Sequence, residues 1–87
     1  MKHKVLKVHP KDNVIVALTN LKKGEIVSFR GNDYVLQDDV NAKHKFFEKE
    51  MQPGDEAIMY GVLVGKAQKL IPAGGLMTTE NLKHAAL

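Results

Sequence analysis

The sequence predicts a mostly β domain with many turns and at most one or two short helical turns. Short segments of β-branched or alternating apolar residues recur along the chain, and glycine or proline separates them. One turn pattern appears three times, at residues 21–27, 51–57 and 71–77, where a glycine stands three residues after an apolar residue. Glycine supplies the positive φ of a tight turn, so each unit should deliver the chain into a strand.

The strand candidates follow in order between these turns. They are residues 4–9, 13–18, 25–30, 34–37, 43–47 and 57–61. The pair on either side of Gly31-Asn32-Asp33 predicts a β-hairpin over about residues 26–36. The best helical segments, residues 46–51 and 64–71, are short, and a helix below about 12 residues is marginal without tertiary support.

The same pattern predicts a core and three glycine turns. The expected core residues are Val5 or Leu6, Val14, Val16, Leu18, Val27, Val35, Phe46, Ile58 and Ile71. The glycines expected in turns are Gly24, Gly54 and Gly74.

Composition limits the possible classes of protein. Residues 1–87 are long enough for one domain, and the apolar fraction of 44% is typical of a folded soluble chain. The absence of cysteine excludes disulfides, thiolate metal sites and a cysteine nucleophile. The longest apolar run, residues 14–18, is far too short to cross a membrane, so we expect a cytoplasmic protein without a membrane partner.

The charges give little support to nucleic-acid or nucleotide binding. The net charge of +3 mildly favours anionic partners, but the lysines are scattered and Arg30 is the only arginine. The Gly-Lys pair at residues 65–66 does not form a phosphate-binding loop, because three residues instead of four separate Gly61 from Gly65 and Ala67 follows the lysine.

Two polar segments are candidates for chemistry. His44 lies between Lys43 and Lys45, whose charges should keep its imidazole neutral and suited to act as a base or ligand. The alternative is an ordinary strand with a half-buried histidine. Residues 78–81, Thr-Thr-Glu-Asn, follow the last glycine turn and can present oxygen atoms to a polyol or a metal. They can equally form a plain C-terminal edge.

Three segments and one further residue together resemble a known family. VHPKDNVIVAL, AKHKF and YGVLVGKAQKLIPAGG, with Asn81, resemble the N-terminal domain of altronate and galactarate dehydratases. The resemblance extends over nearly the whole chain and implies the SAF type of β-clip fold. The family also includes split enzymes such as sulfolactate sulfo-lyase. The resemblance therefore implies a small subunit that docks on a large catalytic dehydratase-family subunit.

The resemblance also implies which residues meet a substrate or partner. The family's polar strand usually reads Val-His-x-His-Asn, and here Thr78 and Glu80 replace both histidines while Asn81 is kept. His44 and Lys45 match the family's His-Lys pair. We expect the side chains of His44, Lys45, Glu80 and Asn81 to converge on one exposed face, with Thr78 beside them.

The family reaction removes water, or sulfite in the sulfo-lyase branch, from the position β to a carboxylate. Such elimination needs a base, an acid and a cation, and the resemblance implies a divalent metal, with iron as one candidate. The implied substrate is a hydroxylated carboxylic acid such as a sugar acid or sulfolactate. This chain offers too few clustered groups for all three roles, which predicts an accessory, non-catalytic subunit of a carbon–oxygen or carbon–sulfur lyase. The alternative is a stand-alone β-clip binding module without lyase activity.

Overall fold

The structure, a computed structural model that describes residues 4–84, consists of eight β-strands joined by turns. The strands are β1 (Val5–Leu6), β2 (Val14–Ala17), β3 (Ile26–Phe29), β4 (Asn32–Val35), β5 (Lys45–Phe47), β6 (Glu56–Met59), β7 (Val62–Ala67) and β8 (Leu82–His84). The mostly β prediction is confirmed. Residues 4–84 contain no helix, and therefore none that could cross a membrane.

The two predicted helical turns are wrong. Residues 46–51 begin inside β5, and residues 64–71 begin inside β7. Strand β7 is hydrogen-bonded on both sides, to β6 and to β8. Pairing with two neighbours therefore outweighs the weak local helix preference of such a short segment.

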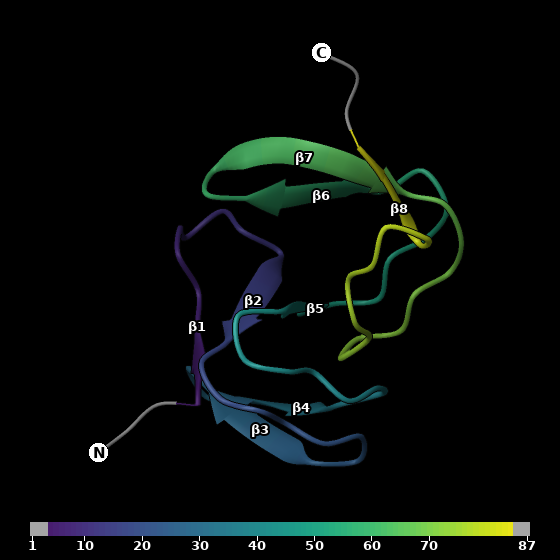
Figure 1. Cartoon of the computed structure of the whole chain (residues 1–87). Helices are drawn as coiled ribbons and strands as arrows, with labels where there is room; N and C mark the ends of the chain where they lie inside the picture. The colour runs from purple at the N-terminus through teal and green to yellow at the C-terminus, as the bar shows by residue number, and fades with distance from the viewer. Residues whose placement is uncertain (1–3, 85–87) are drawn as a thin grey trace.

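The strands form three antiparallel sheets, in the orders β1-β2-β5, β3-β4 and β6-β7-β8. Figure 1 shows β2 and β5 in the middle of the molecule, with the β3–β4 hairpin on one side and the β6–β7 hairpin on the other. The register within the middle sheet places Ile15 opposite Phe46. The central strands thus connect the two hairpins.

Residues 21–40 and 51–71 fold in the same way. Each segment is a hairpin whose first and last residues are joined by two backbone hydrogen bonds of 2.7 to 2.9 Å. At each tip two successive residues have positive φ: Arg30 (51°) and Gly31 (82°), then Tyr60 (58°) and Gly61 (76°). This is the type I′ turn, whose twist matches that of the strands. The hairpin predicted over about residues 26–36 is therefore confirmed, with its tip at residues 30–31.

The repeated turn pattern has one geometry at all three places. Gly24, Gly54 and Gly74 have φ of 87°, 91° and 85°. The residue after each glycine donates its amide to the carbonyl three residues earlier, at 2.9 to 3.0 Å. The glycine amide itself bonds at 2.8 Å to a carbonyl of another segment, which for Gly74 is that of Phe47. The third turn therefore brings residues 75–77 alongside β5, and the prediction that these glycines lie in turns is confirmed.

The core has two parts, one under each hairpin. The first core comprises Val5, Ile15, Ala17, Leu21, Val27, Leu36, Val40 and Phe46. The second core comprises Val14, Phe47, Met51, Ala57, Ala67, Ile71 and Leu82. Successive side chains of a strand point to opposite faces, so neighbours in β2 and in β5 enter different cores.

The predicted core is confirmed in part. Val5, Val14, Val27, Phe46 and Ile71 are buried, whereas Val16 and Ile58 are half-buried. The prediction is wrong for two residues, Leu18 and Val35, which are 50% and 49% exposed. Leu18 follows the end of β2, and Val35 is the last residue of β4 in a two-stranded sheet, where the next residue, Leu36, is buried in its place.

Candidate functional site

The polar segment after the last glycine turn folds back on itself. Asn81 is 8% exposed; its Oδ1 accepts the Thr78 amide at 2.9 Å and its Nδ2 donates to the Leu76 carbonyl at 2.7 Å. The Thr78 hydroxyl oxygen accepts the amides of Asn81 at 3.1 Å and Glu80 at 3.2 Å. Thr78 and Asn81 therefore stabilise the turn that leads into β8, which we name the polar turn (residues 78–81).

This geometry divides the predicted site residues of the polar turn into two kinds. The prediction that Asn81 lies on an exposed face is wrong, because its side chain turns inward to satisfy buried backbone groups. Thr78 is half-buried, and its hydroxyl oxygen serves the turn. Glu80 is exposed, so its carboxylate remains directed to the surface.

His44 and Lys45 lie at the start of β5, next to the chain that enters the polar turn. The Lys45 carbonyl accepts the Met77 amide at 2.9 Å, and Phe46 is bridged to Leu76. The structure therefore brings the backbone of this pair beside the polar turn. His44 is exposed and Lys45 is half-buried. Within residues 4–84, no hydrogen bond or ion pair joins either side chain to Thr78, Glu80 or Asn81.

A surface hollow opens along the polar turn. Its volume is about 450 Å³, and its polar lining includes Asp38, Lys69, Thr78, Glu80 and Asn81. One carboxylate oxygen of Asp38 accepts the Leu76 amide at 3.1 Å, which holds this wall in place. Neither His44 nor Lys45 lines this hollow. Three of the five predicted residues thus line this hollow, whereas Lys45 lies in β5 and His44 lies directly before it.

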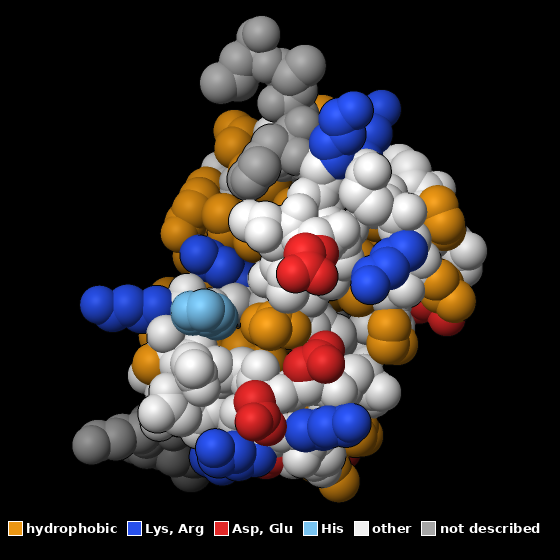
Figure 2. Space-filling model, turned by 45° about the vertical axis from the view of Figure 1, so that its right-hand side comes forward, with side chains coloured by type: hydrophobic (Ala, Val, Ile, Leu, Met, Phe, Trp, Pro, Cys, Tyr) orange, Lys and Arg blue, Asp and Glu red, His pale blue; other side chains and the backbone are white. Residues whose placement is uncertain are grey.

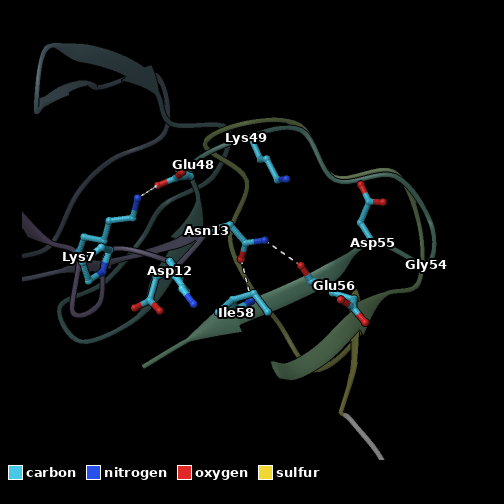
Figure 3. A pocket seen from close by; sticks show the side chains of 11 residues that line it. Lys7, Asp12, Asn13, Glu48, Lys49, Gly54, Asp55, Glu56 and Ile58 are labelled. Carbon is cyan, nitrogen blue, oxygen red and sulfur yellow. Dashed lines mark hydrogen bonds and ion pairs between the residues drawn. The ribbon is translucent and has the colours of Figure 1, made fainter. Parts of the chain in front are cut away.

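A second hollow of about 550 Å³ lies between the loop after β1 and the β6 strand (Figure 3). The ammonium of Lys7 forms an ion pair with Glu48 at 2.8 Å on one side, and Asp55 and Glu56 lie on the other. Lys49 also contributes to its lining. Side chains of both signs surround this hollow, so no single-sign field selects an anion or a cation. Figure 2 shows the same mixture of acidic and basic side chains across one face of the molecule.

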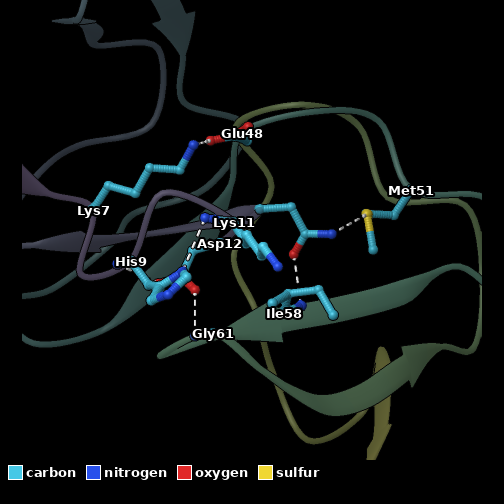
Figure 4. A network of polar contacts seen from close by, with 9 residues as sticks. Lys7, His9, Lys11, Asp12, Glu48, Met51, Ile58 and Gly61 are labelled. Carbon is cyan, nitrogen blue, oxygen red and sulfur yellow. Dashed lines mark hydrogen bonds and ion pairs between the residues drawn. The ribbon is translucent and has the colours of Figure 1, made fainter.

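Two buried polar residues beside this hollow, Asp12 and Asn13, connect distant parts of the chain (Figure 3), and Figure 4 shows the contacts around Asp12. Asn13 accepts the Ile58 amide at 2.8 Å and donates to the Glu56 carbonyl at 2.8 Å, at the irregular step of β6. Asp12 accepts the amides of Gly61 at 2.9 Å and His9 at 3.0 Å. Both residues therefore fix the second hairpin to the start of β2.

The environment of Asp12 favours the ionised carboxylate. Burial by itself raises the pKa of Asp12, because it removes the charge from water. Hydrogen bonds from the backbone amides of Gly61, Tyr60 and His9 oppose this effect, and the positive field of His9 adds to them. Together they lower the pKa of Asp12 below its ordinary value. This carboxylate is thus a structural acceptor and not a proton donor.

The implied divalent metal does not find a ligand set in the described part of the chain. Within residues 4–84, no three histidine or carboxylate side chains gather closely enough to hold a metal ion. Glu80, the replacement for a family histidine, lies in the polar turn, while His44 lies directly before β5. The residues described therefore do not fit a metal held by this domain alone.

The sequence matches one domain of a known enzyme family. A family model described as the altronate/galactarate dehydratase SAF domain matches residues 3–85. The chain belongs to this family. The three antiparallel sheets of the SAF domain are consistent with the β-clip fold that the resemblance implied.

Two curated altronate dehydratases show how small a part of each relative this SAF domain represents. It is 31% identical over 78 residues to the altronate dehydratase of Bacillus subtilis (strain 168) and 39% identical over 69 residues to that of Escherichia coli (strain K12). The alignments cover 90% and 79% of this chain, but only 16% and 14% of the two relatives.

Several residues that carry the family resemblance have a structural role in the SAF domain. Asp12 and Asn13 were not among the predicted functional residues, although one signal was present: they stand directly before the buried run of β2. Gly61 packs directly against the ring of His9. A Cβ added to Gly61 would come within 2.9 Å of a ring carbon, so the close approach requires glycine. Gly65 similarly allows β8 to approach, since its Cβ would meet the Lys83 carbonyl oxygen.

Proposed function

We propose that this SAF domain is the accessory part of a dehydratase of its family, binding a larger catalytic chain and completing the pocket for a hydroxylated carboxylic acid. The family match over residues 3–85 carries this proposal. The curated relatives support it, because the aligned segment makes up only 16% and 14% of proteins named altronate dehydratase. Altronate and galactarate are accordingly the first substrates to test.

The polar turn and the start of β5 are the parts of the domain that we assign to substrate or partner contact. Glu80 and His44 are exposed on neighbouring segments, and the hollow along the polar turn is open to solvent. Ligand sites usually enclose most of the ligand, so a second surface is needed to close this hollow. Lys45 and Lys69 can attract the carboxylate of an acid, and Glu80 can accept hydrogen bonds from its hydroxyl groups.

In this proposal the domain binds and orients, and the larger chain supplies the groups that transfer protons. Elimination β to a carboxylate requires removal of the proton α to that carboxylate and protonation of the leaving hydroxyl. The buried polar side chains of the described residues already accept hydrogen bonds from backbone amides. These side chains are those of Asp12, Asn13 and Asn81. The exposed residues are therefore assigned to positioning the acid.

A reconstitution experiment tests the proposal. The purified chain, a dehydratase-family chain that lacks an SAF domain, and their mixture are each assayed for conversion of altronate and galactarate to keto acid. We expect turnover by the mixture and none by the SAF domain alone. Turnover by the SAF domain alone that disappears in His44→Ala would contradict the accessory role. Failure to assemble with such a chain would favour the stand-alone binding module.

Variants of the polar turn separate substrate contact from folding. Glu80→Ala and His44→Ala should lower kcat/KM of the mixture by about tenfold or more without weakening assembly, because both side chains are exposed. Asn81→Ala should instead destabilise the domain, since its partners in the polar turn are left unsatisfied. Unchanged kinetics in both Glu80→Ala and His44→Ala would remove these residues from the proposed site.

A further inference from the structure

The two hairpins fold in the same way, but their edges are covered differently. In the second hairpin (residues 51–71), β7 pairs with β8, so this sheet has three strands. The first hairpin (residues 21–40) forms a sheet of two strands only, and Figure 1 shows β3 at the end of the molecule opposite β7. An edge strand presents backbone amides and carbonyls that can pair with another strand.

Ile26 and Ser28 carry the outward backbone groups of β3. The type I′ turn makes Phe29 and Asn32 a hydrogen-bonded pair, and such pairs alternate along an antiparallel ladder. The amides and carbonyls of Ile26 and Ser28 therefore point away from β4. Within residues 4–84, neither residue forms a backbone hydrogen bond outside the hairpin. We name these outward groups the open edge of β3.

The equivalent edge of β6 is covered by Asn13 (Figure 3). Glu56 begins β6 as Ile26 begins β3. Ile58 corresponds in the same way to Ser28. Asn13 donates its side-chain amide to the Glu56 carbonyl at 2.8 Å and accepts the Ile58 amide at 2.8 Å, and its backbone amide donates to the Ile58 carbonyl at 3.2 Å. The chain thus covers this edge in one hairpin and leaves it open in the other.

The exposed face beside the open edge is apolar, whereas the equivalent face of the second hairpin is charged. Ile26 and Val35 stand directly opposite each other, so their side chains share one face, and they are 62% and 49% exposed. At the equivalent place of the second hairpin, Glu56 stands opposite Lys66, and both are exposed. The fold of the hairpin therefore does not require an apolar pair here.

The edge of β4 is already approached by other parts of the chain. The Val35 carbonyl accepts the side-chain amide of Gln37 at 3.1 Å, and a Cβ on Gly74 would collide with the same carbonyl oxygen. The backbone amide of Gln37 donates to the Gly74 carbonyl at 3.0 Å. Of the two edges, that of β3 is therefore the one left for another strand.

We propose that the open edge of β3 binds an extended segment of the catalytic chain, which joins the β3–β4 sheet as a third strand. The inference rests on the proposed function and adds the place and mode of contact. The second hairpin indicates the kind of occupant, because other segments of polypeptide, β8 and Asn13, cover both of its edges. An added strand supplies main-chain donors and acceptors, and one of its side chains would cover Ile26. The relatives named altronate dehydratase contain further chain that can supply it, since the aligned segments are only 16% and 14% of them.

The first test compares Ser28→Pro with Ser28→Ala in the full chain. Proline removes the outward amide, and edge strands tolerate proline where that amide faces solvent. Alanine keeps the amide and removes only the hydroxyl, which donates to Asp33 at 2.6 Å. Calorimetric titration with the dehydratase-family chain of the reconstitution experiment gives Kd. We expect Ser28→Pro to raise Kd by about tenfold or more and Ser28→Ala by about twofold or less.

A second pair of variants keeps the test decisive if thermal unfolding shows that proline disturbs the fold. Ile26→Lys places a charge beside the open edge, and Val62→Lys makes the same change at an apolar residue of the second hairpin that is 57% exposed. We expect Ile26→Lys to raise Kd by about tenfold or more and Val62→Lys to leave it unchanged. In wild-type chain, residue-resolved hydrogen exchange of the Ile26 and Ser28 amides should slow by about tenfold or more on assembly.

The other outcomes separate this inference from the proposed function. Assembly with unchanged exchange at Ile26 and Ser28, and with wild-type Kd for Ser28→Pro and Ile26→Lys, would overturn the open edge as the interface and leave the accessory role standing. If the mixture does not assemble, both proposals fall. A homodimer in native mass spectrometry that Ser28→Pro abolishes would overturn the inference in favour of a second copy of this chain.

Discussion

Asp12 and Asn13 show how two adjacent side chains can join parts of the chain that lie more than forty residues apart. Asn13 bonds to the backbone of Ile58, and Asp12 to that of Gly61. Sequence patterns did not predict these contacts, because an Asp-Asn pair is equally common in a surface turn. The conformation of the turn glycines could be predicted, because the preference of glycine for a positive φ is a local property of the backbone and needs no long-range contact.

Replacement of Asp12 by asparagine should lower the free energy of unfolding by about 1.5–3 kcal/mol at pH 7. The amide can accept at only one atom, and its NH2 group would face a backbone amide donor of His9 or Gly61. The control Asp33→Asn changes an exposed residue and should cost less than about 0.5 kcal/mol. Urea denaturation measures both values, and equal stability of Asp12→Asn and the wild type would contradict the assigned role.

The same variant should change the pH dependence of stability. The folded-state pKa of Asp12 is lowered, so its contribution is fully present above the ordinary aspartate pKa of about 3.9. It is then lost as the pH falls through the folded-state pKa. The difference between the wild type and Asp12→Asn should therefore shrink in acid, as urea denaturation at pH 7 and pH 3 can show.

The three glycine turns share one backbone geometry but differ in their surroundings. A Cβ on Gly54 would meet nothing within 4 Å, whereas a Cβ on Gly74 would collide with the Val35 carbonyl oxygen. The repeated pattern in the sequence was sufficient to predict the turns. It could not predict this collision, because Val35 approaches Gly74 only in the folded molecule. The polar turn shows the same limit: its residues were expected in a polar strand, but the strand begins only at Leu82, and the burial of Asn81 was not predicted.

Alanine at the two glycines should therefore have unequal effects. Gly54→Ala should cost about 1 kcal/mol, which is the strain of a positive φ without a new contact. Gly74→Ala should cost about 3 kcal/mol or more, because the backbone of Val35 must also move. Chemical denaturation of the two variants gives the comparison. Equal losses would mean that residues 71–77 can shift away from β4 without cost.

At the scale of the whole molecule, β2 and β5 unite two cores that would otherwise be separate. Phe46 belongs to the first core and Phe47 to the second, and both are fully buried. The sequence predicted short strands and buried apolar residues, yet it could not divide those residues between two cores. That division depends on the register of β2 and β5, which long-range hydrogen bonds determine.

A smaller side chain at either phenylalanine should destabilise the entire domain. We expect Phe46→Leu and Phe47→Leu each to lower the free energy of unfolding by about 1–2 kcal/mol, with one cooperative transition. Leu70→Ala, at a residue that is 54% exposed, should cost less than about 0.5 kcal/mol. Amide hydrogen exchange is the decisive measurement, since loss of protection in one hairpin alone would show that the cores unfold independently.

The two hairpins that fold in the same way have a consequence for how this domain can evolve. Residues 21–40 and 51–71 form separate hairpins on either side of the central strands, and Figure 1 shows both tips on the same side of the molecule. A substitution at one tip leaves the neighbours of the other untouched, so selection can alter the two tips independently. A descendant can therefore acquire a binding surface at the tip that contains Arg30 without altering the tip that contains Tyr60.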